Sequence, residues 1–359
     1  MMLSNRRATP VLAAMGLGLF ALQALPAHAE KFSVTNLVSD GSVPAVTVDP
    51  LLINPWGMSY APTGPFWVSD NNAGVSTLYN GAGAKSPLNV AIPPPAGGSG
   101  SGTATGQVYN STNGFQVTSG GVTGASVFLF ATEDGTISGW APSVDGTNAI
   151  LAVDNSAGGT GAVYKGLAIG TIGKNTFLYA ANFRAGDVEV YNSKFGLVKT
   201  FTDPTVPAGY APFNVQNLGG TLYVTFAKQD HSKHDDKSGP HHGYVDTFTL
   251  NGTFQARLVT RGRLNSPWGL DIAPAGFGSL AGDLLVGNFG DGVINAFNPT
   301  TGAFVTSLHG ADGNPIVLGD LWGLINGNGG QGGDANTVYF TAGLQDEAHG
   351  LFGSLAVLP

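Results

Sequence analysis

The sequence predicts an all-β protein, a six-bladed β-propeller in which an N-terminal strand closes the last blade. Three observations lead to this prediction. A four-strand pattern recurs six times, and no segment after residue 29 keeps a helical apolar period over three turns. Glycine is also frequent, with 55 residues among 359, as short strands joined by tight turns require.

Residues 1–29 are interpreted as a signal peptide. Residues 6–7 are both arginine, residues 11–25 are apolar, and residues 27–29 form a small-residue cleavage pattern. The apolar stretch is short for a membrane span, although a retained N-terminal anchor is the alternative. We expect a secreted or periplasmic bacterial protein in which residues 30–359 form a single propeller domain, with two separate β domains as the alternative.

The composition excludes several classes of site. The chain has no cysteine, so disulfides, thiolate metal sites and a cysteine nucleophile are excluded. It has 15 Lys+Arg against 23 Asp+Glu and no basic run, so we expect no nucleic-acid partner. Phosphate-binding and dinucleotide-binding loops and a Gly-x-Ser-x-Gly motif are also lacking. The sequence leaves open whether the protein is an enzyme.

The second strand of each predicted blade is the most regular element. Its six copies span residues 66–70, 128–132, 177–182, 222–225, 284–288 and 338–341. After each copy a turn ends in glycine, and a large apolar residue follows five positions later. These pairs are Gly74/Tyr79, Gly135/Trp140, Gly186/Tyr191, Gly243/Phe248, Gly292/Phe297 and Gly350/Leu355. The constant offset indicates one repeated unit.

The first strand of each blade is predicted to open with an aromatic residue. Trp-Gly occurs at 56–57, 268–269 and 322–323, and Phe115, Tyr164 and Phe213 take the matching place elsewhere. A more variable fourth strand follows, as at 254–260 and 303–308. Because the last repeat ends without a fourth strand, residues 32–38 are predicted to supply it and remove an open edge.

Several short motifs resemble known propeller families. Pro-Trp-Gly, Leu-Tyr-Val and Gly-x-x-x-x-aromatic elements resemble NHL-type repeats. More closely, the chain is similar to an uncharacterised family of exported bacterial propeller proteins. The stretches that carry this similarity are 35–40, 54–57, 227–230 with the loop that follows, and 347–353. The resemblance covers essentially all of residues 30–359 and implies fold and export, but no established reaction.

NHL-like propellers include binding modules and metal-dependent lactonases and esterases. In the lactonases, the resemblance implies a divalent cation held in the channel by a glutamate near the start of the first inner strand. Here that strand opens with Asn54. The glutamates after residue 29 all lie away from inner-strand starts, at Glu30, Glu133, Glu189 and Glu347. We therefore do not carry the lactonase mechanism over.

Two polar loops are candidate metal sites. Both connect the second and third strands of a blade, in blades four and six, and such loops overlook the mouth of the central channel. Imidazole and carboxylate groups together suit Zn, Cu, Mn or Fe. The predicted ligands are Asp230, His231, His234, Asp235, Asp236, His241, His242, Asp346, Glu347 and His349. The alternative is a solvated loop, and a shared site requires the longer loop to fold inward.

A second candidate site is the channel mouth itself, at the starts of the inner strands. The predicted ligand-binding residues there are Asn54, Asn113, Lys165, Asn214, Gln216, Asn265 and Asp320. Amide oxygens with one carboxylate could hold Ca²⁺. The alternative is that these side chains bond to backbone groups at strand ends. The tryptophans of the Trp-Gly pairs are expected to pack in the core rather than to stack on a ligand.

The hypothesis that these features favour is an exported binding module. It would take a small-molecule or protein ligand at the channel face, with a divalent metal bound by the His/Asp-rich loop. One alternative is a metal-dependent hydrolase of lactones or esters, with His234, His242 or His349 as the base. Another is a structural surface or matrix protein, which needs only the fold and export.

Overall fold

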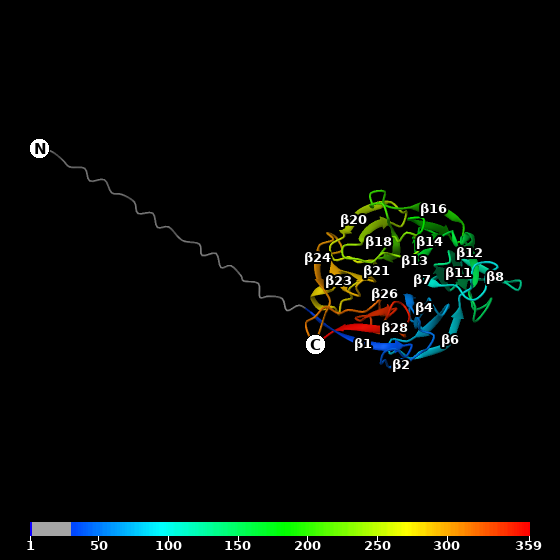
Figure 1. Ribbon diagram of the computed structural model, residues 1–359, viewed down its shortest axis with the longest axis horizontal. Helices are drawn as coiled ribbons and strands as arrows, with labels where there is room; N and C mark the ends of the chain where they lie inside the picture. Colours follow the sequence, from blue (N-terminus) through cyan, green and yellow to red (C-terminus); the bar gives the residue numbers. More distant parts are fainter. Residues whose placement is uncertain (2–29) are drawn as a thin grey trace.

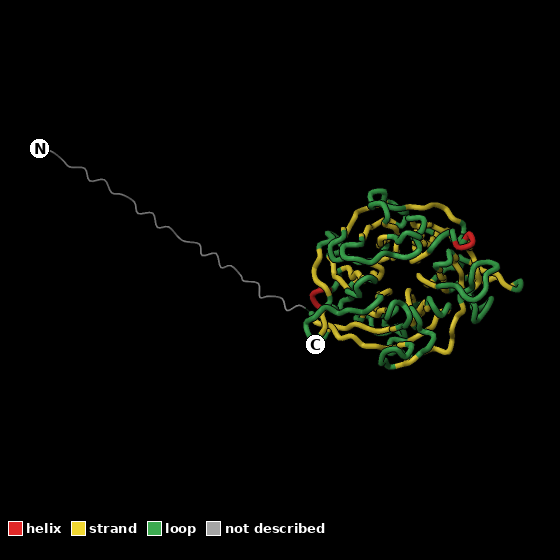
Figure 2. The backbone as a smooth tube through the Cα atoms, in the orientation of Figure 1, coloured by secondary structure: helices red, strands yellow, loops and turns green. Residues whose placement is uncertain are grey.

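The computed structural model describes Met1 and residues 30–359, so the predicted signal peptide lies, Met1 apart, outside the described residues. Six sheets surround a central axis (Figure 1), which confirms the predicted six-bladed β-propeller. Strands and loops make up nearly all of the ring (Figure 2); the described helices are two short 3₁₀ segments, η1 (Ala157–Gly159) and η2 (Gly278–Leu280). Among the described residues, no helix has the length and apolar character needed to cross a membrane.

The first three blades follow one another along the chain, each with its first strand innermost. Blade one consists of β3 (Pro55–Ser59), β4 (Phe66–Asp70), β5 (Val75–Tyr79) and β6 (Lys85–Ala91). Blade two consists of β7 (Ala104–Tyr109), β10 (Phe128–Thr132), β11 (Thr136–Trp140) and β12 (Ile150–Asp154). Blade three consists of β13 (Tyr164–Ile172), β14 (Asn175–Asn182), β15 (Asp187–Asn192) and β16 (Leu197–Phe201).

Blades four and five repeat this order, and blade six combines both ends of the chain. Blade four consists of β17 (Tyr210–Leu218), β18 (Thr221–Lys228), β19 (Tyr244–Thr249) and β20 (Phe254–Thr260). Blade five consists of β21 (Pro267–Ile272), β22 (Leu284–Asn288), β23 (Ile294–Phe297) and β24 (Phe304–Ser307). Blade six consists of β26 (Leu321–Asn326), β27 (Val338–Ala342), β28 (Leu351–Val357) and β1 (Lys31–Ser39).

The constant five-residue offset of the repeats corresponds to one cross-strand pair in every blade. An apolar residue near the start of the second strand lies opposite the large apolar residue of the third. The six pairs are Phe66/Tyr79, Phe128/Trp140, Leu178/Tyr191, Leu222/Phe248, Leu284/Phe297 and Val338/Leu355. All twelve side chains are buried. Directly opposed residues of antiparallel strands are close enough to pack as a unit, so this pair anchors each blade.

Each inner strand also carries a bulge at one equivalent position. The pairing with the second strand skips one residue in the first half of each inner strand, namely Trp56, Thr105, Lys165, Phe213, Trp268 and Trp322, and in blades one, two and six it also skips the glycine that follows. A bulge re-aims the side chain of its extra residue. Four of these side chains come from four different blades and still pack together, which places the bulge residues around the channel axis.

The packed bulge residues form what we call the aromatic plug: Trp56, Phe213, Trp268 and Trp322. Each is at most 1% exposed. Trp56 and Trp322 are stacked with ring centroids 3.4 Å apart, and Trp268 meets both edge-on. The plug fills the channel near the starts of the inner strands. The channel therefore has a mouth above the plug and an exit at the strand ends below it.

Blade two departs from the predicted pattern. Its inner strand is β7, so the expectation that Phe115 opens this strand is wrong. At the bulge, Thr105-Gly106 replaces Trp-Gly, and this pair lacks the aromatic signal of the other repeats. Phe115 instead precedes an added hairpin, β8 (Gln116–Ser119) and β9 (Val122–Ala125), and packs edge-on against Phe195 of blade three.

The N-terminal strand closes the ring as predicted. β1 pairs antiparallel with β28, from Phe32 opposite Val357 to Ser39 opposite Leu351. The two strands, at opposite ends of the colour scale, lie side by side in Figure 1. The short strands β2 (Thr47–Val48) and β25 (His309–Gly310) pair with the outer edge of β1. These contacts leave blade six without a long open edge.

Candidate functional site at the channel mouth

A small polar cavity of about 170 Å³ lies at the mouth, directly above the aromatic plug. Trp56 and Trp322 form part of its lining. The charged lining residues are four carboxylates and one ammonium group: Glu133, Asp235, Asp236, Glu347 and Lys165. Negative charge therefore exceeds positive charge in a partly desolvated space, where electrostatic interactions are stronger than in water.

Three loops between second and third strands supply the four carboxylates. Glu133 directly follows β10 in blade two, Asp235 and Asp236 lie between β18 and β19, and Glu347 lies between β27 and β28. The loops of blades four and six, both singled out from the sequence, line the same cavity. The longer loop of blade four therefore does fold inward over the channel.

Lys165 is the bulge residue of blade three and stands at the centre of this charge cluster. It is only 2% exposed. Its ammonium group forms ion pairs with Glu133 and, at 3.2 Å, with Asp235 Oδ1, and it lies 5.2 Å from the centre of the Trp56 ring. Burial alone would lower the pKa of Lys165, but the two carboxylates outweigh burial and raise it. Lys165 is therefore a fixed internal cation.

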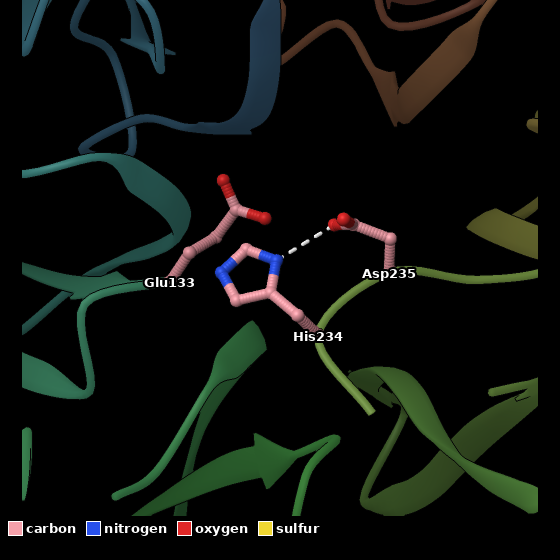
Figure 3. A group of neighbouring side chains, drawn as sticks. All are labelled: Glu133, His234 and Asp235. Atoms are coloured by element: carbon pink, nitrogen blue, oxygen red, sulfur yellow. Dashed lines mark hydrogen bonds and ion pairs between the residues drawn. The ribbon is translucent and has the colours of Figure 1, made fainter. Parts of the chain in front are cut away.

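Glu133, His234 and Asp235 form a cluster that could hold a metal ion. One donor atom from each residue lies within 4.8 Å of the others, and the imidazole lies between the two carboxylates (Figure 3). His234 Nδ1 bonds to Asp235 Oδ1 at 2.8 Å, which raises the pKa of His234 and lowers that of Asp235. Among the described residues His234 Nε2 has no hydrogen bond, so this nitrogen is available as a ligand.

Glu347 lines the same cavity from the loop of blade six. Its carboxylate accepts a 2.6 Å hydrogen bond from Asn54 Nδ2, and its backbone N–H donates to Asp320 at 3.3 Å. Burial, with the nearby charge of Glu133, raises the pKa of Glu347 to about 7. Burial also raises the pKa of Asp236. The mouth therefore contains carboxyl groups that readily take up a proton, as expected where negative charge is in excess.

The loop that carries Glu347 has an unusual backbone. Leu344, Gln345, Asp346 and Glu347 have φ values of 44°, 52°, 56° and 64°. Four consecutive non-glycine residues therefore adopt the left-handed conformation, which costs roughly 1–2 kcal/mol each for L-amino acids. Such residues usually occur singly, and strained backbone tends to occur at functional sites. The fold holds Glu347 at the cavity despite this cost.

The remaining predicted metal ligands do not reach the cavity. Asp230 accepts hydrogen bonds from Ser232 Oγ and the His234 backbone N–H, and so organises its own loop. His231, His241 and Asp346 are exposed. Three of the predicted histidines form hydrogen bonds elsewhere: His241 Nδ1 with Gly262 O, His242 Nδ1 with Lys237 O, and His349 Nδ1 with Asp40 Oδ2. Of the ten predicted ligands, the structure gathers His234, Asp235, Asp236 and Glu347 at the mouth.

Most of the predicted channel-mouth amides bond to neighbouring parts of the fold. The side-chain oxygens of Asn54, Asn214 and Asn265 accept hydrogen bonds from Trp322 Nε1, Val215 N and Gly239 N respectively. Asn54 and Asp320 directly precede inner strands with φ values of 49° and 52°, a conformation that Asn and Asp tolerate best after glycine. These contacts agree with the alternative that the side chains form hydrogen bonds at the ends of strands. They leave few amide oxygens to coordinate a calcium ion.

Two other predicted residues lie away from the mouth. Asn113 is exposed in the connection from β7 to β10, next to Gly114 and the turn at Ser193 of blade three. Because this connection follows an inner strand, it lies on the opposite face of the ring. Gln216 is near the end of its inner strand and lines a cavity at the channel exit.

Glu133 is the functional candidate that sequence reasoning missed as a ligand. Neither histidine nor a long polar insertion marks its loop, which reads Thr-Glu-Asp-Gly between β10 and β11. Its position could have identified it, because Glu133 lies between the second and third strands of its blade, as do the two loops predicted to bind metal. Asn71, in that connection of blade one, donates a 2.8 Å hydrogen bond to Glu133 Oε2.

The fold and the site together define a six-bladed β-propeller with an acidic channel mouth. No protein-family model matches the chain. It is 32% identical to "Uncharacterized protein R648" of Acanthamoeba polyphaga mimivirus over 331 residues, 90% of this chain and 80% of that protein. It is also 32% identical to protein L690 of the same virus over 334 residues, 90% of this chain and 85% of that protein. The chain belongs to the family that includes these two proteins.

The expectation of a bacterial family is therefore wrong, because these homologues are proteins of a giant virus. The stretches behind that expectation lie in β1, at the start of β3 and around the loops of blades four and six. Short stretches of this kind carry little information about the source of a sequence.

Solved structures show the same fold at low sequence identity. Selenomethionine-substituted virginiamycin B lyase from Staphylococcus aureus aligns with a TM-score of 0.51 and 14% identity, over 91% of this chain and 100% of that one. A structural genomics protein of unknown function from Bacteroides thetaiotaomicron aligns with a TM-score of 0.53 and 9% identity, over 92% of this chain and 76% of that one. At these identities the likeness concerns the fold alone.

Proposed function

We propose that this protein is a binding module whose channel mouth holds a divalent cation. The observation that carries the proposal is the cluster of Glu133, His234 and Asp235, whose donor atoms lie within 4.8 Å of one another beside the mouth cavity. Two loops from different blades build this cluster, so the folded propeller assembles the donors and neither loop alone could do so.

The charge of the site supports a cation as the ligand. Four carboxylates and one ammonium group line the cavity. Burial and then the charge of Glu133 raise the pKa of Glu347, and a divalent ion there would offset the excess negative charge. One imidazole with two carboxylates suits Zn²⁺, Mn²⁺ or Fe²⁺ better than Ca²⁺, which prefers oxygen ligands alone.

Metal titration of matched histidine variants tests the proposal. Isothermal titration of metal-free protein with ZnCl₂ and MnCl₂ should show one site in the unaltered chain and at least tenfold weaker binding in His234→Ala. His231→Ala is the matched control, because His231 is exposed in the same loop and has no side-chain hydrogen bond among the described residues. Equal binding by all three proteins would contradict a site at His234.

A second candidate function, a metal-dependent hydrolase of esters or lactones, is favoured by one observation. Glu347 lines the same cavity with a pKa of about 7, close to that of an effective general base at neutral pH. In such a reaction Glu347 would take the proton of a water molecule that attacks the carbonyl carbon and pass it to the departing alkoxide. A bound metal ion would supply polarisation of the carbonyl.

Glu347→Gln separates the two functions. If the protein is a hydrolase, this variant should lose at least a hundredfold in turnover of γ-lactone and aryl-ester substrates while zinc binding persists. Asp346→Asn is the matched control, because Asp346 is the exposed neighbour on the same turn. Absence of metal-dependent turnover in the unaltered protein would exclude the hydrolase, and metal binding would remain as the proposed function.

We also propose that the protein is exported. Support comes from the N-terminal sequence, where two arginines, an apolar stretch and Ala27-His28-Ala29 follow the order of a secretory signal. Mass spectrometry of protein expressed from the full-length gene should then find a chain that begins at Glu30. An intact N-terminus on protein retained inside the cell would refute export.

A further inference from the structure

A groove of about 450 Å³, which we call the rim groove, lies between blades four and five. These blades are neighbours in the ring (Figure 1), and their outermost strands are β20 and β24. Val259 of β20 and Phe304 of β24 line the groove, together with Arg263 from the connection between β20 and β21. No residue lines both this groove and the mouth cavity, so the two sites are independent.

One side chain is smaller at this blade boundary than at the boundary before it. Phe201 of blade three and Val259 of blade four have the same register opposite the third strand of their blades. Phe201 packs on Phe248 of the next blade with ring centroids 4.9 Å apart. Val259 instead packs with Phe297, the equivalent of Phe248 in blade five, and both line the groove. Valine in place of phenylalanine therefore leaves a hollow beside the ring of Phe297.

The ionisable side chains that line the rim groove are Arg263 and His241, and among the described residues no carboxylate lines it. This is unusual in a chain with 23 Asp+Glu against 15 Lys+Arg. The Arg263 guanidinium lies 5.1 Å from the centre of the Phe304 ring and forms no ion pair within the described part of the chain. Arg263 is exposed and Phe304 is 41% exposed, so a ligand can reach both side chains.

The backbone around the rim groove is held in an unusual conformation. His241 and Arg261 have φ values of 67° and 51°, in the left-handed region that non-glycine residues rarely adopt. His241 Nδ1 donates a 2.7 Å hydrogen bond to Gly262 O, which ties the loop before β19 to the connection that carries Arg263. The basic wall of the groove is therefore fixed before any ligand arrives, which lowers the cost of binding.

We propose that the rim groove binds a small apolar carboxylate, a molecule with an aromatic or aliphatic body and one carboxylate group. The carboxylate pairs with the Arg263 guanidinium, whose planar fork of N–H donors matches two carboxylate oxygens. The apolar body lies against Val259, Phe297 and Phe304. A single guanidinium balances a monoanion better than a phosphate monoester, which carries a charge of about −1.5 to −2. The volume of the groove is typical of small-molecule sites.

Saturation-transfer NMR and calorimetry with matched pairs of probes test the proposal. The pairs are 3-phenylpropanoate with 3-phenylpropanamide, and octanoate with octanamide. All measurements contain EDTA, so that a metal ion at the mouth cannot hold the carboxylate. At least one acid should bind, and its amide should bind about three- to tenfold more weakly, the usual effect of losing one hydrogen bond to an exposed group. Arg263→Gln should weaken binding of the acid by the same factor and leave binding of the amide unchanged.

Val259→Phe tests the location of the site. This change supplies the side chain that Phe201 provides at the preceding boundary, so it should fill the groove and abolish binding at a nearly unchanged melting temperature.

Lys174→Gln is the matched control for charge, because Lys174 is exposed in the turn between β13 and β14 and does not line the groove. It should leave binding of the acid unchanged. If Val259→Phe does not fold, the exposed residue Arg263 decides the case. Any of four results would overturn the proposal: no binding of either acid, equal binding of acid and amide, binding that persists in folded Val259→Phe, or equal affinities in Arg263→Gln and Lys174→Gln.

Discussion

Lys165 shows how one side chain sets the character of the channel mouth. Inner strands of other blades place an aromatic residue at the bulge in four cases, whereas blade three places a lysine there. Its long stem lies in the apolar centre, and its ammonium group meets Glu133 and Asp235. The same carboxylates are the proposed metal ligands, so Lys165 and a metal ion compete for them.

Replacement of Lys165 by methionine should therefore separate stability from metal binding. In chelator, Lys165→Met should lower the free energy of unfolding by about 1–3 kcal/mol, because Glu133 loses a buried partner while Asp235 remains partly solvated. Zinc should then bind more tightly than in the unaltered protein. Thermal unfolding with EDTA and with ZnCl₂ measures both effects, and identical zinc-induced shifts in the two proteins would argue against competition.

Glu347 should make stability depend on pH in a predictable direction. Its pKa rises from 4.5 to about 7 on folding, so the folded protein holds this proton more tightly than the unfolded chain does. The contribution of Glu347 to the free energy of unfolding is therefore fully present below pH 4.5, and this contribution is lost as the pH rises towards 7. Between pH 4.5 and 7.5 the free energy of unfolding of the unaltered protein should fall by on the order of 1–3 kcal/mol relative to that of Glu347→Gln.

Urea unfolding of both proteins at pH 4.5, 5.5 and 7.5 measures this difference. Asp246 and Asp271 also have pKa values raised to about 7 by burial, but both proteins contain them, so they cancel in the comparison. Parallel stability profiles for the two proteins would contradict a raised pKa at Glu347.

At the residue scale, the sequence predicted part of the site. His234, Asp235 and Lys165 were identified because a His/Asp-rich loop and an inner-strand start both face the mouth of a propeller. Glu133 was missed because a single glutamate in a short turn has no distinctive neighbours. The inward path of the long loop could not be predicted, because it depends on contacts such as Asp235 with Lys165 that join distant parts of the chain.

At the scale of elements, the left-handed turn from Leu344 to Glu347 is the most unusual segment. Glycine adopts this backbone conformation without the steric cost that other residues bear, although it loses more entropy on folding. Gln345→Gly should therefore raise the free energy of unfolding by about 0.5–1 kcal/mol. Chemical denaturation measures the change.

Gln116→Gly is the matched control for this prediction, since Gln116 is an exposed glutamine in the ordinary strand β8. That substitution should lower stability by roughly 0.5–1 kcal/mol, the usual cost of glycine in a strand. Destabilisation by both glycines would argue against the left-handed conformation of the turn.

Elements were predictable from the sequence wherever a repeated pair of large residues marks them. All six second strands were found, because each lies at a fixed offset from a glycine and a large apolar residue of the third strand. The more variable fourth strands expected at 254–260 and 303–308 correspond to β20 and β24. β7 was not found, because Thr105-Gly106 stands where tryptophan-glycine occurs in three other blades and the added hairpin displaces the next aromatic residue.

For the whole molecule, stability depends on the closure of blade six. Removing residues 30–40 should lower the melting temperature by more than 10 °C and cause association, because β28 would expose a full strand edge. The comparison protein begins at Glu30 and keeps β1. Differential scanning fluorimetry and light scattering test the prediction, and a shortened protein that stays monomeric with an unchanged melting temperature would refute it.

The pairing of β1 with β28 also sets the order of events during synthesis. Ser33 bonds to Ala356, 323 positions further along the chain. At translation rates of roughly 5–20 residues per second, β1 leaves the ribosome about 15–65 s before its partner strand exists. During that interval five blades can form while the ring stays open, and β1 must avoid other partners. A circularly permuted gene that places β1 directly after β28 should remove this delay, so the ring would close as the last strand emerges.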